Sequence, residues 1–235
     1  MESARRSVAV LLAGGIGARA GLGMPKQFAE LRGRTILGHA LAALHDHPGV
    51  EGVLVVMAPG YVDAARVVTA GHPRVLDVIE GGAERSDSTV AALRWLADHA
   101  LAGADLLVHD AARPLVSARI ISDCLAALAT HQAVGVAVRS SDTILRADAT
   151  GRVVDVPPRG ELWRAQTPQG FRAGVLQRAY DVALADPAFV ATDDCSVVLR
   201  YLPDVPVQVV EGEDRNMKVT GPDDLAIAER LLGLG

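Results

Sequence analysis

The sequence is poor in cysteine, in aromatic residues and in excess positive charge. Its two cysteines, Cys124 and Cys195, lie outside any Cys-x-x-Cys pair or Cys/His cluster. A disulfide framework or a structural zinc is therefore not expected, and a reducing cytoplasm fits. Aromatic residues make up 3% of the chain and the formal net charge is −5. Because general nucleic-acid binding needs a basic footprint or stacking platforms, we expect no nucleic-acid partner.

Long hydrophobic runs are also missing. The apolar run at residues 7–13 enters glycines and is far shorter than the roughly 20 residues that cross a bilayer. We therefore expect no signal core, no membrane partner and a cytoplasmic location. Half of the 235 residues are hydrophobic, which is enough for a large core that needs no disulfide bonds or metal ions to stabilise it. We predict a single domain over residues 1–235.

Short apolar runs alternate with longer segments of helical period. Almost continuously apolar strands that alternate with helices are typical of an α/β fold with an open, mostly parallel sheet covered on both faces. The predicted strands are residues 7–13, 50–59, 74–82, 104–114, 133–140 and 205–213. The predicted helices are residues 35–47, 60–72, 84–101, 117–132, 173–186, 192–202 and part of 216–232, where Pro222, Asp223 and Asp224 suit the first turn.

The alternation breaks after Ser140. Residues 142–147 and 152–158 are two short strand-like pieces around an Asp-Ala-Thr-Gly-Arg segment, which indicates a hairpin. A two-stranded ribbon alone is only marginally stable in water. We therefore expect the hairpin to pack on a partner subunit, and assign residues 140–162 to a protruding dimerisation β-arm.

The first predicted strand runs into a glycine-rich loop. The segment from Gly15 to Ala20 fits the G-x-G-x-x-G/A pattern, so a dinucleotide-binding oxidoreductase that uses NAD is one alternative. That pattern needs a carboxylate at the end of the second strand, which here ends in Met57 and an Ala-Pro pair. The loop instead carries two cations, Arg19 and Lys26, which suit a triphosphate with charge building on its leaving group.

Ligands of open α/β sheets bind at the carboxyl ends of the strands. Polar groups fall at those ends in four segments, residues 14–26, 81–88, 109–113 and 141–143. We predict that these segments converge on one functional site.

Seven ordered blocks resemble the motifs of the IspD/TarI group of cytidylyltransferases. They are LAGGIGARAGLGMPKQF, GGAERSDST, VHDAARP, SDTI, RAQTPQGF, TDDCS and NMKVTGPDDLAIAE, and they extend from about residue 7 to residue 232. The resemblance implies a Rossmann-like nucleotidyltransferase fold and a homodimer with an exchanged β-arm. It also implies transfer of CMP from CTP to a polyol phosphate, with Mg²⁺ and with release of pyrophosphate.

The resemblance assigns a role to each matching residue. Arg19, Lys26 and Lys218 would hold the reacting phosphates. The CTP-binding residues would be Ala13, Gly14, Gly15, Gly82 and Ser88. The acceptor-binding residues would be Asp110, Arg113, Thr143, Arg159 and Thr167, with Arg159 reaching across the dimer interface. Mg²⁺ would sit mainly on the CTP phosphates, with Asp110 and Asp142 as secondary candidates for its ligands.

The identity of the acceptor stays open. Leu12-Ala13-Gly14-Gly15, where the usual pattern is Pro-Ala-Ala-Gly, resembles enzymes that use ribitol 5-phosphate. The HDAARP and RAQTPQGF blocks resemble instead enzymes that use 2-C-methyl-D-erythritol 4-phosphate. A non-catalytic nucleotide-binding protein with the same fold is a further alternative.

Overall fold

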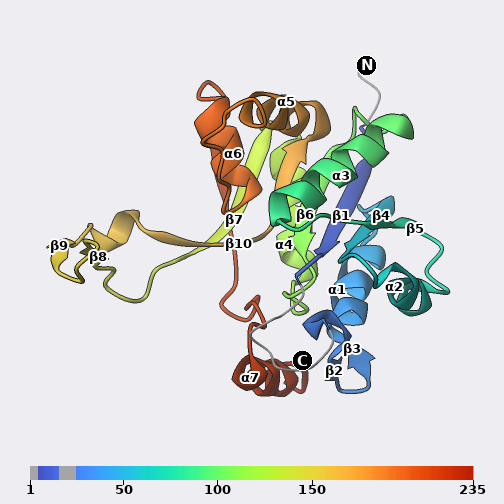
Figure 1. The fold of residues 1–235 in the computed structure, drawn as a ribbon. Coiled ribbons are helices and arrows are strands. Elements are labelled where there is room, and N and C mark those ends of the chain that lie inside the picture. The colour runs from blue at the N-terminus through green and yellow to red at the C-terminus, as the bar shows by residue number, and fades with distance from the viewer. Residues whose placement is uncertain (1–4, 16–24, 235) are drawn as a thin grey trace.

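The computed structural model describes residues 5–15 and 25–234, and within them a seven-stranded sheet forms the centre (Figure 1). Its strand order is β11-β7-β10-β6-β1-β4-β5. Every neighbouring pair is parallel except the two that involve β10, so the predicted mostly parallel sheet is confirmed. The strands are β1 (Ser7–Ala13), β4 (Gly52–Met57), β5 (Val75–Glu80), β6 (Asp105–Asp110), β7 (Ala133–Arg139), β10 (Trp163–Arg172) and β11 (Val207–Glu211).

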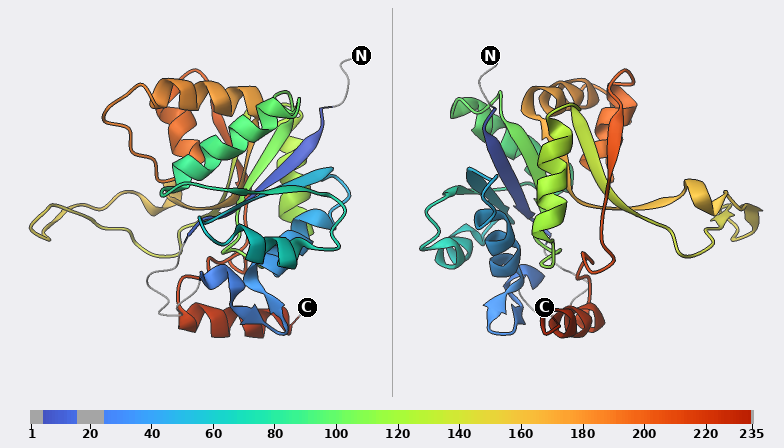
Figure 2. Two further views of the ribbon diagram at one scale, coloured as in Figure 1. Left: turned by 45° about the vertical axis from the view of Figure 1, so that its right-hand side comes forward. Right: turned by 180° about the vertical axis from the view of Figure 1, so that it is seen from behind.

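Helices cover both faces of this sheet (Figures 1 and 2). One face carries α1 (Ile36–His45), α2 (Val62–Thr69) and α4 (Ala118–Leu128), and the other α3 (Arg85–Asp98), α5 (Ala173–Ala183) and α6 (Asp194–Tyr201). Strand β1 shows why both faces are needed. Ala9 and Leu11 pack in the first helical layer, whereas Val8 and Val10 pack in the second, because successive side chains of a strand point to opposite faces.

A smaller group of elements lies past the carboxyl ends of the parallel strands (Figure 1). It consists of the short helix η1 (Lys26–Phe28), the hairpin β2 (Glu30–Leu31) and β3 (Arg34–Thr35), and the helix α7 (Pro222–Leu232). As predicted, Pro222 opens α7, and the carboxylate of Asp224 accepts hydrogen bonds from the backbone N–H of Thr220 (2.7 Å) and Gly221 (3.1 Å). The α7 helix thereby holds the segment that precedes it, which carries Lys218.

The predicted β-arm projects away from the body of the subunit (Figures 1 and 2). Its strands β8 (Arg146–Ala147) and β9 (Val153–Asp155) form a sheet of their own, followed by the short helix η2 (Arg159–Glu161). Apolar side chains of the arm, among them Leu145 and Val154, are 57% and 58% exposed. Dimerisation through the arm stays a prediction.

The sequence pattern missed β10, which inserts antiparallel between β6 and β7. Its residues, WRAQTPQGFR, alternate in polarity only over the first four and contain no continuous apolar run. The pairing with β7 shifts register between Ala165 and Gln169, where Pro168 offers no N–H to the ladder. The consequence for the site is large, because β10 brings Thr167 beside the end of β6. The short β2–β3 hairpin was also not predicted.

Across the described residues, no helix combines the length and the apolar character that crossing a membrane requires.

Candidate active site

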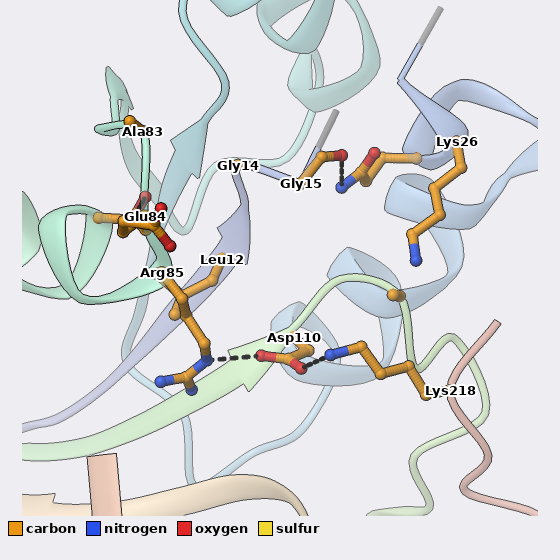
Figure 3. Close-up of a pocket in the computed structure, with 12 residues that line it drawn as sticks. Leu12, Gly14, Gly15, Lys26, Ala83, Glu84, Arg85, Asp110 and Lys218 are labelled. Carbon is orange, nitrogen blue, oxygen red and sulfur yellow. Dashed lines mark hydrogen bonds and ion pairs between the residues drawn. The ribbon is translucent and has the colours of Figure 1, made fainter. Parts of the chain in front are cut away.

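The carboxyl ends of β1 and β6 border a cavity of about 190 Å³ (Figure 3). The predicted site residues that line it are Gly14, Gly15, Lys26, Ser88, Asp110 and Lys218. They come from the end of β1, from η1, from α3, from the end of β6 and from the segment before α7. The expected convergence is confirmed for the described parts of three segments, residues 14–26, 81–88 and 109–113, whereas residues 141–143 line neither cavity and lie at the start of the β-arm.

A second cavity, of about 140 Å³, adjoins the first. Arg85, Asp110 and Lys218 line both cavities. The second cavity adds Arg113 and Thr167, both predicted to bind the acceptor, together with Gln166, Gln169, Thr192 and Asp193. Two ligands, one in each cavity, would meet at the three shared side chains.

Asp110 lies between two cations at this junction (Figure 3). Its Oδ1 accepts a hydrogen bond from Arg85 Nε (3.2 Å), and its Oδ2 accepts one from Lys218 Nζ (2.8 Å). Burial alone would raise the pKa of the Asp110 carboxyl, but the charges of Arg85 and Lys218 outweigh burial and hold that pKa well below its ordinary value. Asp110 is therefore a carboxylate near neutral pH.

Backbone contacts fix the two lysines that line the first cavity. Lys26 Nζ donates to the carbonyl oxygen of Val219 (2.8 Å), the residue after Lys218. The Val219 N–H in turn donates to the carbonyl oxygen of Ala112 (2.8 Å), just beyond β6. These contacts bring η1 and the segment before α7 together, so both ammonium groups border one cavity (Figure 3).

Gly14 lets the end of β1, and Gly82 the loop after β5, approach the first turn of α3. A Cβ on Gly14 would lie 3.0 Å from the Oγ of Ser88, and a Cβ on Gly82 would collide with the Cβ of Asp87. The carbonyl oxygen of Gly15 accepts a hydrogen bond from Gln27 Nε2 (2.8 Å; Figure 3). The backbone of this loop is thus close to the cavity without side chains to obstruct it.

A buried network fixes the backbone at the end of β6. Thr167 Oγ1 accepts from the N–H of Asp110 (3.0 Å) and lies 2.9 Å from Nδ1 of His109. His109 Nε2 lies 3.0 Å from the carbonyl oxygen of Arg113. Burial lowers the pKa of His109 to about 4, so the imidazole is neutral. In that state Thr167 donates to Nδ1, and Nε2–H donates to the carbonyl, which satisfies every group.

The residues present do not fit a magnesium ion held by the protein at Asp110. Both of its oxygens already accept hydrogen bonds from cationic side chains. Asp142 is exposed at the start of the arm. Within the described ranges, no group of three or more His, Cys, Asp or Glu side chains could hold a metal ion.

Four further predicted residues that the structure describes line neither cavity. Ala13 is fully buried in β1, and Gly82 supports the start of α3 rather than lining a cavity. Thr143 and Arg159 belong to the β-arm, where Arg159 Nη1 donates to the carbonyl oxygen of Ser141 (3.3 Å). Arg19 lies outside the described residues.

Sequence reasoning overlooked Arg85 and Thr192. Both belong to motif blocks of the resemblance, GGAERSDST and TDDCS, but the resemblance assigns a role to neither residue. A charged residue at the first position of a helix, inside a motif that also carries Ser88, was the available indication for Arg85.

The model of the IspD family, described as 2-C-methyl-D-erythritol 4-phosphate cytidylyltransferase, matches residues 7–233. A relative of that same name from Thermobifida fusca (strain YX) is 50% identical over 236 residues, which cover 98% of this chain and 94% of the relative. Another relative, the bifunctional ribulose 5-phosphate reductase/CDP-ribitol pyrophosphorylase Bcs1 of Haemophilus influenzae, is 39% identical over 96% of this chain. This chain spans 48% of that relative's length.

Solved structures show the same similarity. The 4-diphosphocytidyl-2C-methyl-D-erythritol synthase of Anaerococcus prevotii superposes with a TM-score of 0.85 at 26% identity, covering 97% of this chain and 99% of the other. The 2-C-methyl-D-erythritol 4-phosphate cytidylyltransferase of Francisella tularensis superposes with a TM-score of 0.81 at 30% identity, covering 96% and 99%. The chain therefore belongs to the IspD family of cytidylyltransferases and is a CTP-dependent nucleotidyltransferase.

Proposed function

We propose that the enzyme transfers CMP from CTP to 2-C-methyl-D-erythritol 4-phosphate, giving a CDP-polyol and pyrophosphate. The observation that carries the proposal is the pair of adjoining cavities that share Arg85, Asp110 and Lys218. A cytidylyl transfer needs such an arrangement, because a nucleotide and a phosphorylated acceptor must meet with their reacting phosphates in contact. The name of the relative that is 50% identical supports this acceptor.

The reaction needs charge stabilisation more than acid–base catalysis. An oxygen of the acceptor phosphate attacks the α-phosphorus of CTP, a new P–O bond forms, and the bond to the β-phosphate oxygen breaks. The second pKa of a phosphate monoester is about 6, so the nucleophile is already dianionic near neutral pH and needs no general base. Positioned cations then lower the barrier by bringing two anions together and by stabilising the leaving pyrophosphate.

The first cavity suits the nucleotide. Backbone groups at Gly14 and Gly15 can approach it closely, and Lys26 and Lys218 supply positive charge for its phosphates. Ala13, Gly82 and Ser88 would shape the cytidine side, and Arg19 would add a further cation to the glycine loop. In this assignment Lys26, Lys218 and Arg19 are the catalytic residues.

The second cavity suits the acceptor. Asp110 would accept hydrogen bonds from polyol hydroxyl groups, Thr167 supports the loop, and Arg113 lies beside them.

We propose further that the arm, residues 140–162, exchanges in a homodimer. Thr143 and Arg159 would then act in the partner's acceptor site. The half-exposed apolar side chains of the arm support this assembly, because a lone hairpin is marginally stable.

Two further features belong to the proposal. Mg²⁺ would enter on the CTP phosphates, where it would neutralise charge while keeping several waters. A cytoplasmic location is supported by the cysteines, which are free thiols, and burial raises the pKa of Cys124 to about 12. A buried thiol of this kind suits a reducing compartment and plays no part in the reaction.

An acceptor panel tests the proposal. We expect pyrophosphate release when CTP, Mg²⁺ and 2-C-methyl-D-erythritol 4-phosphate are all present, and none when any one is omitted. In direct competition at one CTP concentration, ribitol 5-phosphate should be the poorer acceptor. Preference for ribitol 5-phosphate would support the alternative suggested by the Haemophilus influenzae relative and by Leu12-Ala13-Gly14-Gly15. No turnover with either acceptor would contradict the proposed reaction.

The variant Lys218→Ala tests the junction of the cavities. Removing this ammonium group should lower kcat/KM by about 100-fold, because it stabilises the reacting phosphates. Arg178→Ala is the matched control, since it removes a positive charge from the exposed face of α5. Unchanged activity in Lys218→Ala would remove Lys218 from the catalytic residues.

A further inference from the structure

A carboxylate that lines neither cavity is tied to the junction between them. Asp194 opens α6, and its side chain is 0% exposed. Its Oδ1 accepts a hydrogen bond from the hydroxyl of Tyr180 on α5 (2.6 Å), and its Oδ2 accepts one from Nη1 of Arg85 on α3 (2.6 Å). Among the described residues that border the cavities, neither Asp194 nor Tyr180 is found, so substrates do not explain these contacts.

The surrounding elements leave Asp194 little freedom. Its backbone N–H donates to Oε1 of Gln169 on β10 (3.0 Å). The preceding residue, Asp193, caps α6 by accepting from the N–H of Ser196 (2.7 Å). Burial, and next the charge of Asp194, raise the pKa of Tyr180, so the phenol keeps the proton that it donates. A buried carboxylate held in this way can dictate where its cationic partner lies.

Arg85 shows the effect of that constraint. An arginine paired only with Asp110 would be expected to form two parallel hydrogen bonds with it. Instead, Arg85 gives Asp110 a single bond from Nε at 3.2 Å, and gives its shorter bond, 2.6 Å, to Asp194. Its Nη2 is buried and has no hydrogen-bond partner among the residues that the structure describes. The orientation of the guanidinium is therefore set by Asp194 at the expense of its other contacts.

The constraint extends to Asp110 and Lys218, which line both cavities. Arg85 holds one oxygen of Asp110, and Lys218 holds the other. Burial alone would lower the pKa of Arg85, but the carboxylates of Asp194 and Asp110 raise it, so the guanidinium that links them keeps its charge. Without the charge of Asp194, Arg85 could turn to pair with Asp110 through two nitrogens. The carboxylate would then be less available to acceptor hydroxyl groups.

We propose that Asp194, supported by Tyr180, is a positioning residue of the transfer reaction: it fixes Arg85 and, through Arg85, orients Asp110 for the acceptor. The inference rests on the proposed function and extends it to a residue outside both cavities. It concerns the acceptor end, because Asp194 lies beside Thr192, Asp193 and Gln169, which border only the second cavity.

The variant Asp194→Asn tests the role, with initial rates measured by pyrophosphate release while each substrate is varied in turn. The specificity constant for the acceptor should fall by about 10-fold to 100-fold, as expected when a reacting group is misplaced by a fraction of an ångström. The KM for CTP should stay within about threefold of wild type. The proposal would be overturned if KM rose equally for CTP and for the acceptor, or if the specificity constant for the acceptor did not fall.

Asp105→Asn is the matched control. Asp105 is a mostly buried carboxylate on β6, the strand that carries Asp110, and pairs with Arg5 (2.9 Å) at the far end of that strand. Its replacement should lower stability and leave the acceptor kinetics unchanged.

Tyr180→Phe removes only a hydroxyl group, so it provides the test if Asp194→Asn does not fold. It should raise the acceptor KM by about threefold and leave CTP unaffected. A wild-type acceptor KM there would overturn the proposal.

A double variant separates positioning from general damage to the fold. If Asp194 acts through Arg85, Asp194→Asn should cost nothing further in an Arg85→Met background, and the two effects should be strongly non-additive. Additive losses would mean that Asp194 does not act through Arg85. Wild-type enzyme without activity toward either polyol phosphate would instead contradict the proposed function, so the two failures are distinguishable.

Discussion

At the scale of single residues, His109 supports the site only while it is uncharged. Its folded pKa of about 4 lies below the ordinary value of 6.5, and burial is the main cause. Between these values the unfolded chain takes up a proton that the folded chain does not. The stability that this difference supplies is complete above pH 6.5 and is lost as the pH falls toward 4. Its upper limit is about 3 kcal/mol.

Urea denaturation at a series of pH values measures this effect. Between about pH 7 and pH 5, the free energy of unfolding of wild type should fall more steeply than that of His109→Gln, which has no imidazole to protonate. The control His99→Gln changes an exposed histidine at the end of α3 and should keep the wild-type slope. Identical slopes for wild type and His109→Gln would show that the burial of His109 does not control acid stability.

The same residues show what the sequence could and could not reveal. Motif resemblance pointed to Asp110 and Lys218, and the structure places them in contact although they are 108 positions apart. The TDDCS block contains Asp194, but the motif does not indicate that Asp194 pairs with Arg85, which is 109 positions away. Such a pair arises from the packing of α3 against α5 and α6, and no local pattern of polarity encodes it.

At the scale of elements, the start of α3 depends on a glycine that precedes it. A Cβ at Gly82 would collide with Asp87, whose carboxylate accepts a hydrogen bond from the N–H of Glu84 (2.9 Å) and so caps the helix. Gly82→Ala should therefore loosen the first turn, which carries Arg85 and Ser88. We expect a loss of about 1–2 kcal/mol in stability. Affinity for CTP should weaken as well.

The comparison with Gly103→Ala isolates this packing effect. Gly103 lies in the loop before β6, and a Cβ there would meet nothing within 4 Å. This variant should match wild type in urea denaturation and in calorimetric titration with CTP. If Gly82→Ala behaves like Gly103→Ala in both measurements, the close approach of β5 and α3 is not what requires glycine.

Elements differed in how readily their sequences predicted them. β4 is buried along its whole length and β1 along all but its first residue, and helices flank both strands, so their apolar runs stand out. β10 could not be predicted in the same way, because it has no continuous apolar run and a proline interrupts its ladder. The motif that carries Thr167 could therefore be recognised in the sequence, although the strand that contains it could not.

At the scale of the whole molecule, the proposed homodimer would complete each site with residues from the partner subunit. Thr143 and Arg159 belong to the arm, which points away from the body that carries the cavities (Figure 1). An exchanged arm would bring them to the partner's second cavity and would also cover its exposed apolar side chains. A closed two-fold dimer makes both exchanges at once.

Complementation between inactive subunits tests this exchange. In a heterodimer of Lys218→Ala and Arg159→Ala chains, isolated through two different affinity tags, one site carries both defects. The other site combines an intact body with an intact arm from the partner. About half of the wild-type activity per dimer should therefore return, although each variant alone is nearly inactive. If Arg159 served its own subunit, every site would keep one defect, and the heterodimer would be no more active than its parents. Failure to recover any heterodimer would argue against the exchanged arm itself.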